Sequence, residues 1–306
     1  MLVLFCEDPI QPGRVDESFD AEARACDAAG LPHALVSFEQ LVAGDAAGAV
    51  RRVPNDAGLA IYRGWMLRPP QYAALHAALL ARGVTMLTSP SAYAWAHELP
   101  GWYATLEGQT PRSIWLQSSA DLDFARVHAA LAAFGDRALV VKDHVKSRKH
   151  EWNDACFIRA ASDRAEVERV VGNFARRQGA DLQGGLVFRE FVELEPVGAH
   201  PKSKMPLSNE WRLFYFKGQR LAVLRYWDDG AYPGEQPPLE RFDTLATKVP
   251  SPFFALDVAR TKRGEWIVME LGDGQVSGLP AERDATAFYA SLFSGWSSGS
   301  STCTSS

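Results

Sequence analysis

Short apolar runs alternate with segments of helical periodicity over the first third of the chain. Four runs are predicted to be buried strands, at residues 2–5, 33–37, 59–62 and 85–87. Before the fourth run, apolar side chains follow the i, i+3, i+4 spacing of one helix face, which Pro69 and Pro70 open. Strands that alternate with helices are typical of a parallel α/β layer. We therefore predict a small doubly wound domain over residues 1–105.

The rest of the chain changes to a mostly β pattern. A strand at 112–116, a helix over 124–134, a strand at 138–141 and a helix over 167–174 come first. Five strands are predicted to follow, at 186–192, 210–216, 221–227, 252–259 and 266–271, with a last helix through 288–293. The expected fold is α/β plus α+β, with a mainly antiparallel sheet in a second domain at 106–295. The aperiodic stretch 98–109 is the predicted boundary, and the Ser-rich segment 296–306 is predicted to be disordered.

The charge balance and the cysteines restrict the classes of partner. The 306 residues carry 32 Lys and Arg against 37 Asp and Glu, so no global positive field would hold nucleic acid, and any anion site must be local. No segment approaches the roughly 20 apolar residues that span a membrane, so no membrane partner is expected. Four cysteines without CxxC spacing fit a reducing compartment, and we expect a cytoplasmic protein. A symmetric homodimer is the default expectation.

Charged residues interrupt the apolar strands of two predicted hairpins, of which the first carries arginines. Gly218 fits a two-residue type II′ turn between the strands 210–216 and 221–227. The register of that turn puts Arg212 opposite Arg225. Like charges that face each other are destabilising, so this pair indicates an anion between them or an unseen carboxylate. Alternatively, both arginines lie on a solvated face.

The second hairpin repeats this arrangement with carboxylates. The register of the strands 252–259 and 266–271 puts Asp257 opposite Glu270, and Asp273 follows three residues later. Two facing carboxylates on apolar strands should share a proton or a cation. Hard oxygen ligands of this kind suit Mg²⁺, which leaves its other positions to water and phosphate. Alternatively, these carboxylates make local hydrogen bonds at strand ends.

A lysine and a basic loop add to this picture. Lys142 ends the predicted strand 138–141, and the polar loop 145–151 after it contains Lys146. A lysine at this place can reach phosphate oxygens as a point charge, although a lysine that only extends to solvent from a strand end is equally consistent. Together with the two hairpins, these residues describe a magnesium–nucleotide phosphate site.

The apolar strand 186–192 is also broken by charge. Arg189 and Glu190 interrupt it, and Glu193 and Glu195 follow it. Backbone that leaves a strand beside carboxylates can contact an adenine edge and ribose hydroxyls. A simple structural pairing of Arg189 with Glu190 is the alternative.

In this order the motifs resemble the ATP-grasp superfamily. A lysine ends a strand, a strand enters an acidic hinge, a Glu-x-Arg strand follows, and two carboxylates lie on a closing hairpin, within residues 105–295. The βα region before them resembles a pre-ATP-grasp domain. The segment 272–279 is similar to that of a bacterial and phage ATP-grasp clade with unassigned substrates.

The resemblance implies ATP and Mg²⁺ as cofactors and gives individual residues roles. The implied cofactor-binding residues are Lys142, Lys146, Arg189, Glu190, Val192, Glu193 and Glu195. Arg212 would hold the γ-phosphate and Arg225 the substrate or a phosphate, as the two catalytic residues. Asp257 and Glu270 would bind the metal, and Asp273 would replace the asparagine that usually follows the second carboxylate.

The expected activity is that of an ATP-dependent ligase, which joins a carboxylate to an amine through an acylphosphate. The substrate would be a small molecule or a peptide, with Lys202 and Lys204 as further contacts of its carboxylate. Two alternatives remain: a phosphotransferase that uses the same nucleotide site, and a nucleotide-binding module without turnover.

Overall fold

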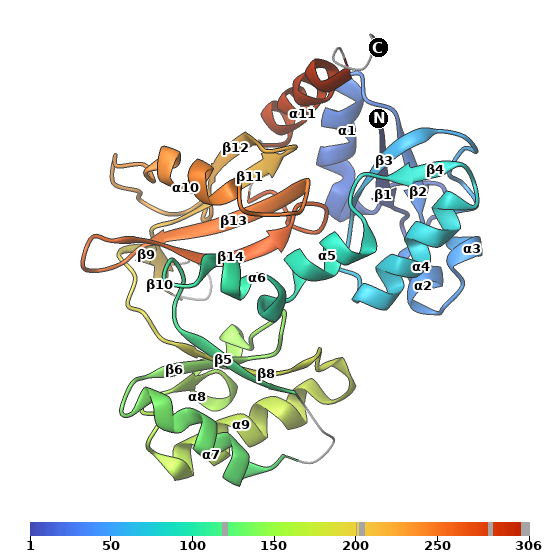
Figure 1. Cartoon of the computed structure of the whole chain (residues 1–306). Helices are drawn as coiled ribbons and strands as arrows, with labels where there is room; N and C mark the ends of the chain where they lie inside the picture. The colour runs from blue at the N-terminus through green and yellow to red at the C-terminus, as the bar shows by residue number, and fades with distance from the viewer. Residues whose placement is uncertain (118–121, 200, 202–205, 281–283, 301–306) are drawn as a thin grey trace.

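The computed structural model describes residues 1–300 apart from 118–121, 200, 202–205 and 281–283. Figure 1 shows three groups of elements: a parallel layer near the N-terminus, a lobe around β5, β6 and β8, and a sheet of β11 to β14 between them. The fold is the predicted one, with a parallel sheet first and antiparallel sheets afterwards.

The N-terminal layer is a four-stranded parallel sheet in the order β2-β1-β3-β4. Its strands are β1 (Leu2–Cys6), β2 (His33–Val36), β3 (Gly58–Arg63) and β4 (Val84–Met86), close to the predicted ranges. Its helices are α1 (Asp20–Ala28), α2 (Phe38–Val42), α3 (Ala46–Ala49) and α4 (Pro69–Leu80). Two prolines start α4 because the first turn of a helix needs no backbone donor there.

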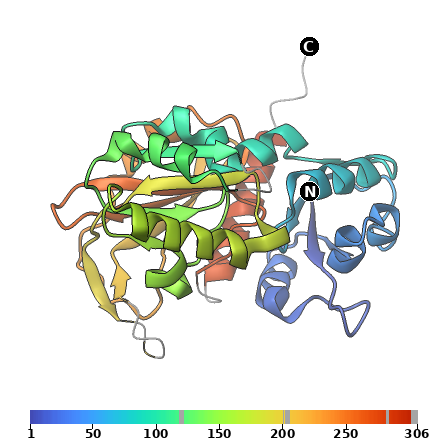
Figure 2. The same ribbon diagram turned by 90° about the horizontal axis from the view of Figure 1, so that it is seen from below.

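The lobe is an antiparallel sheet in the order β5-β8-β6-β7, with helices on one face. The strands are β5 (Ser113–Gln117), β6 (Leu139–Lys142), β7 (Phe157–Ile158) and β8 (Gly185–Glu190). Figure 2 shows α9 (Arg164–Gln178) lying along the lobe, where α7 (Phe124–Leu131) and α8 (Trp152–Ala155) also pack. The apolar stripe of α9 is fully buried, as its i, i+3, i+4 spacing predicts, and comprises Val167, Val170, Val171 and Phe174.

The third group is an antiparallel sheet in the order β12-β11-β13-β14. Its strands are β11 (Glu210–Phe216), β12 (Gln219–Arg225), β13 (Phe253–Arg260) and β14 (Trp266–Asp273). The short hairpin of β9 (Pro196–Ala199) and β10 (Pro206–Ser208) and the helix α10 (Leu239–Ala246) were not predicted.

Two helices occupy the stretch that joins the N-terminal layer to the lobe, α5 (Pro90–His97) and α6 (Leu99–Leu106). The prediction of an aperiodic boundary at 98–109 is therefore wrong. The reason is that Pro100 lies in the first turn of α6, where proline is tolerated. The buried positions Leu99, Trp102, Tyr103 and Leu106 follow helical spacing and pack in the core of the third sheet.

The C-terminal helix α11 (Asp284–Ser300) lies beside α1 and joins the third sheet to the N-terminal layer (Figure 1). One continuous core contains apolar side chains of both, including Phe5, Phe214 and Phe288. The prediction of disorder from residue 296 is wrong for 296–300, which belong to α11, and 301–306 lie outside the described residues.

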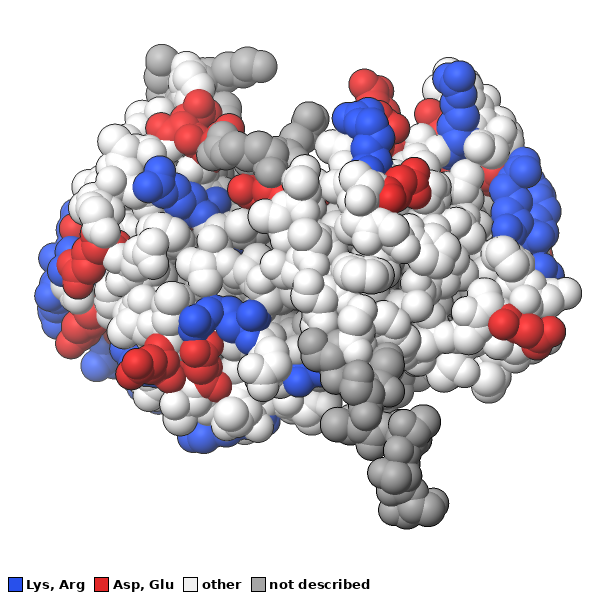
Figure 3. Space-filling model, turned by 90° about the horizontal axis from the view of Figure 1, so that it is seen from above, with Lys and Arg blue, Asp and Glu red and all other residues white. Residues whose placement is uncertain are grey.

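The surface carries charges of both signs. In the view of Figure 3, acidic and basic side chains are interspersed among uncharged ones. Among the described helices, none combines the length and the apolarity that crossing a membrane requires.

Candidate active site

The lobe sheet and the third sheet meet at an ion pair. Lys142, at the end of β6, donates from Nζ to Oε1 of Glu270 on β14, 3.0 Å away. The Lys142 side chain is 8% exposed, whereas that of Glu270 is 43% exposed, so Glu270 can still meet a ligand. Burial raises the pKa of Glu270, but the Lys142 and Lys149 ammonium groups lower it more, and its carboxylate stays ionised.

Arg212 of β11 lies opposite Asp257 of β13 and grips it with two bonds. Its Nε and Nη2 donate to the two carboxylate oxygens at 2.7 Å each, and its Nη1 donates to the carbonyl of Gly278 at 2.7 Å. Burial lowers the pKa of Arg212, but Asp257 raises it more, so the guanidinium is charged throughout. Such a bidentate pair fixes the orientation of the arginine plane.

The register predicted for the second hairpin is confirmed at the carboxylates. Asp257 lies directly opposite Glu270. The turn is one residue longer than expected, and a bulge between the Asp257 and Val258 pairings restores the count. The two carboxylates do not share one cation in this structure, because Arg212 pairs with one and Lys142 with the other.

The register predicted for the first hairpin is wrong. The turn consists of Lys217 and Gly218, both at positive φ as in a type I′ turn, and a bulge shifts the ladder further. Arg225 lies opposite Trp211, and Arg212 lies opposite Leu224. Because a one-residue slip turns a side chain to the other face of the sheet, Arg225 contacts the rings of Trp211 and Tyr232 and the two arginines form no common anion site.

Asp273 does not join the other two carboxylates either. It continues β14 three residues after Glu270 and so points to the opposite face of the sheet. Its Oδ1 accepts from the backbone and side-chain amides of Gln275, and its Oδ2 is buried without a hydrogen-bond partner. Among the described residues, no group of three or more His, Cys, Asp or Glu side chains is placed to hold a metal ion.

Two charged residues to which the sequence reasoning gave no role belong to the same place. Glu210 precedes Arg212 by two residues and shares its face of β11, a spacing that could have revealed it. Burial lowers the pKa of Lys149, but the carboxylates of Glu210, Glu270 and Asp257 raise it more. The charge cluster is defined here as Lys142, Lys149, Glu210, Arg212, Asp257 and Glu270.

Arg189 joins the lobe to the third sheet beside this cluster. Its Nη2 donates to the hydroxyl of Thr110 at 2.7 Å and to the carbonyl of Met269 at 2.6 Å. Burial lowers the pKa of Arg189 to about 10. The structure does not pair it with Glu190, whose carboxylate is 3.4 Å from Arg137.

The predicted acidic hinge follows β8, and its carboxylates have protein partners. Glu193 pairs with Lys262, and Glu195 pairs with Arg260. Val192 is partly buried between them. Lys146 is exposed in a turn where Asp143 accepts from its backbone amide. Lys202 and Lys204 lie outside the described residues.

The buried Asp273 predicts a pH-dependent stability. Burial raises its pKa to about 7, so the folded protein keeps a proton that the unfolded chain releases near pH 4. Stability should therefore fall as pH rises from about 4 to above 7, by up to about 4 kcal/mol, and Asp273→Asn should flatten this decline. Melting temperatures between pH 5 and 8.5 measure it, and parallel curves for the two proteins would show that Asp273 is not responsible.

Comparisons with known proteins agree with this arrangement. The sequence matches a family of ATP-grasp domains, the third family of its clade, over residues 133–292, more than half of the chain. No curated protein matches it.

Solved structures of low sequence identity share the fold. D-cycloserine synthetase DcsG is 16% identical with a TM-score of 0.61, and the match covers 96% of this chain and 99% of that one. The ATP-grasp ligase PsnB, in complex with a minimal precursor, Mg and ADP, is 13% identical with a TM-score of 0.56 and 98% coverage of both chains. D-alanyl-alanine synthetase A from Vibrio cholerae is 12% identical with a TM-score of 0.55, covering 96% of this chain and 95% of that one. With the family match over more than half of its length, this chain belongs to the ATP-grasp family.

Proposed function

We propose that this protein is an ATP-dependent ligase that joins a carboxylate to an amine and that the charge cluster is its nucleotide-phosphate site. The observation that carries this proposal is the meeting of Lys142 from the lobe with Arg212, Asp257 and Glu270 from the third sheet. Cations for phosphate oxygens and carboxylates for a divalent metal thus lie where two sheets face each other. Structural relatives named as synthetases and ligases support the same class.

The residues present fit a magnesium ion. Mg²⁺ prefers one or two carboxylates and keeps its other positions for water and phosphate. Asp257 and Glu270 are cross-strand neighbours, whose Cβ atoms lie about 5 Å apart, so one ion can reach both. When bound, the metal would neutralise charge on the nucleotide phosphates.

The side chains of the cluster would act by position and charge. A substrate carboxylate oxygen attacks the γ-phosphorus of ATP, the bond to the β,γ-bridging oxygen breaks, and ADP leaves. The amine nitrogen then attacks the acyl carbon, phosphate leaves, and the amine loses a proton. Lys142 and Arg212 would hold phosphate oxygens during the first step, since phosphoryl transfer depends on positioning and electrostatic stabilisation.

The acyl and amine substrates are a small molecule or a peptide. The precursor bound by PsnB, and the names of the two synthetases, are compatible with either class. The two domains are proposed to divide this work, with the N-terminal layer next to the end of β14 where the substrate would meet the phosphate.

Product analysis tests the proposal. The protein, Mg-ATP and a mixed pool of amino acids and peptides should yield ADP together with new amide masses. A phosphorylated acceptor without an amide would support a phosphotransferase instead. Tight nucleotide binding with neither product would support a module without turnover, and the absence of nucleotide binding would contradict all three.

A further inference from the structure

A buried arginine of the N-terminal layer holds the loop that follows β14. Arg63, the last residue of β3, has a side chain that is 1% exposed. Its Nε and Nη2 donate to the carboxylate of Glu22, while Nη1 donates to the carbonyls of Gly274 and Ser277. The rings of Phe214 and Phe288 flank the guanidinium. One side chain thus connects α1, β3 and two points of the loop 274–277.

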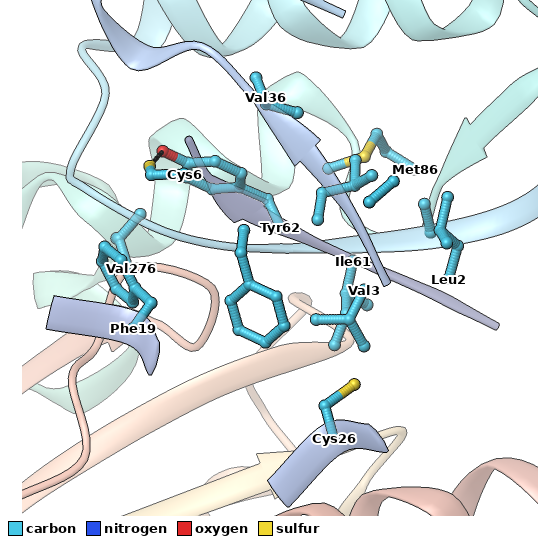
Figure 4. Close-up of a cluster of buried hydrophobic side chains, with 14 of the residues drawn as sticks. Leu2, Val3, Cys6, Phe19, Cys26, Val36, Ile61, Tyr62, Met86 and Val276 are labelled. Carbon is cyan, nitrogen blue, oxygen red and sulfur yellow. Dashed lines mark hydrogen bonds between the residues drawn. The ribbon is translucent and has the colours of Figure 1, made fainter. Parts of the chain in front are cut away.

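The neighbouring backbone of β3 fixes the same loop. The amide of Tyr62 donates to the Gln275 side chain at 2.9 Å, and that of Gly64 donates to the Gln275 carbonyl at 3.3 Å. Figure 4 shows Val276 beside Phe19 in the N-terminal core. A Cβ on Gly274 would lie 2.6 Å from the ring of Phe253, so only glycine permits this close approach.

This loop ends at the charge cluster. The carbonyl of Gly278, next to Ser277, accepts a hydrogen bond from Nη1 of Arg212 at 2.7 Å. The other two contacts of Arg212 go to Asp257, so the loop supplies its one anchor from outside the sheet. A displacement of the loop would therefore free one side of the Arg212 guanidinium.

We infer that Arg63 is a positioning residue for Arg212: by holding the carbonyls of Gly274 and Ser277, it fixes the Gly278 carbonyl that orients the Arg212 guanidinium. This inference rests on the proposed function, in which Arg212 contacts a nucleotide phosphate. Only arginine can do this here, because its planar fork donates toward Glu22 and toward two carbonyls at once, whereas a lysine donates from a single nitrogen.

The test separates the loop contact from the buried ion pair. A double variant, Arg63→Met with Glu22→Gln, removes both charges together and keeps similar volumes, a change that is often neutral for stability. The matched control is Tyr289→Phe, which removes the hydroxyl that donates to Glu22 at 2.7 Å but leaves the loop untouched. Calorimetric titration with Mg-ADP, well below the melting temperature, gives the Kd of each protein. Deuterium uptake of the 274–278 amides reports the loop itself.

We expect the double variant to bind Mg-ADP at least tenfold more weakly and to exchange the loop amides faster, with the control like the wild type. An unchanged Kd in the folded double variant would overturn the inference. Should that variant fail to fold, Gln275→Leu removes another anchor of the same loop without a buried charge, and an unchanged Kd there would overturn it equally. A wild-type protein that does not bind Mg-ADP would instead contradict the proposed function.

Discussion

Glu270→Gln should lower the rate of ATP turnover by about 10²–10³-fold and leave the protein folded. The amide keeps the shape of the side chain, but it cannot offset the charge of a divalent metal or keep the ion pair with Lys142. The Glu270 side chain is 43% exposed, so the loss of its ion pair should cost at most about 1 kcal/mol of stability. Steady-state release of ADP, together with a melting curve, measures both quantities.

Glu168→Gln is the matched control for this prediction. Glu168 also pairs with a basic side chain, His128, at 2.9 Å, but on the helical face of the lobe. Its substitution should leave ADP release unchanged. If Glu270→Gln turns over ATP at the wild-type rate, or unfolds the protein, the carboxylate is structural and the proposed metal site is misplaced.

Arg212→Lys should lower kcat by about 10²-fold for every acceptor although the positive charge is kept. Lysine cannot reproduce two parallel bonds to Asp257 and a third to Gly278, so the cation would lose its fixed orientation. An interaction that stabilises the transition state affects kcat more than KM. Initial rates over a range of ATP concentrations separate the two constants.

Arg225→Lys provides the comparison for Arg212→Lys within the same hairpin. Arg225 lies one strand away on the opposite face, against aromatic rings, and should tolerate lysine with no change in ATP turnover. Equal losses in the two variants would show that both arginines serve the phosphate site, contrary to the observed register.

The strands and the order of the site residues could be predicted from sequence because they follow from apolar periodicity and from charges that interrupt it. Lys142 and Glu270 were both identified, yet no pattern predicted that they would touch, since they are 128 residues apart and belong to different sheets. The registers were less secure. A bulge left Asp257 opposite Glu270 in one hairpin, whereas a bulge and a different turn moved Arg225 to the other face in its neighbour.

The contacts of the loop after β14 had no local signal. Gln275 and Arg63 are ordinary polar residues in the sequence, and their burial depends on how the N-terminal layer docks against the third sheet. Lys149 is similar, because a basic loop predicts that some lysine reaches the phosphate site without predicting which one. Tertiary docking therefore decides the residues that local pattern leaves open.

The contact of Arg189 with Met269 also bears on association between copies of the chain. β14 is an edge strand of its sheet, and an edge with free backbone groups can pair with another molecule. Here Arg189 occupies the Met269 carbonyl, Arg241 occupies that of Trp266, and the Val268 amide donates to Gln109. The same arginine that joins the lobe to the third sheet thus helps to close this edge against intermolecular strand pairing, so its loss should favour aggregation as well as loosen the lobe.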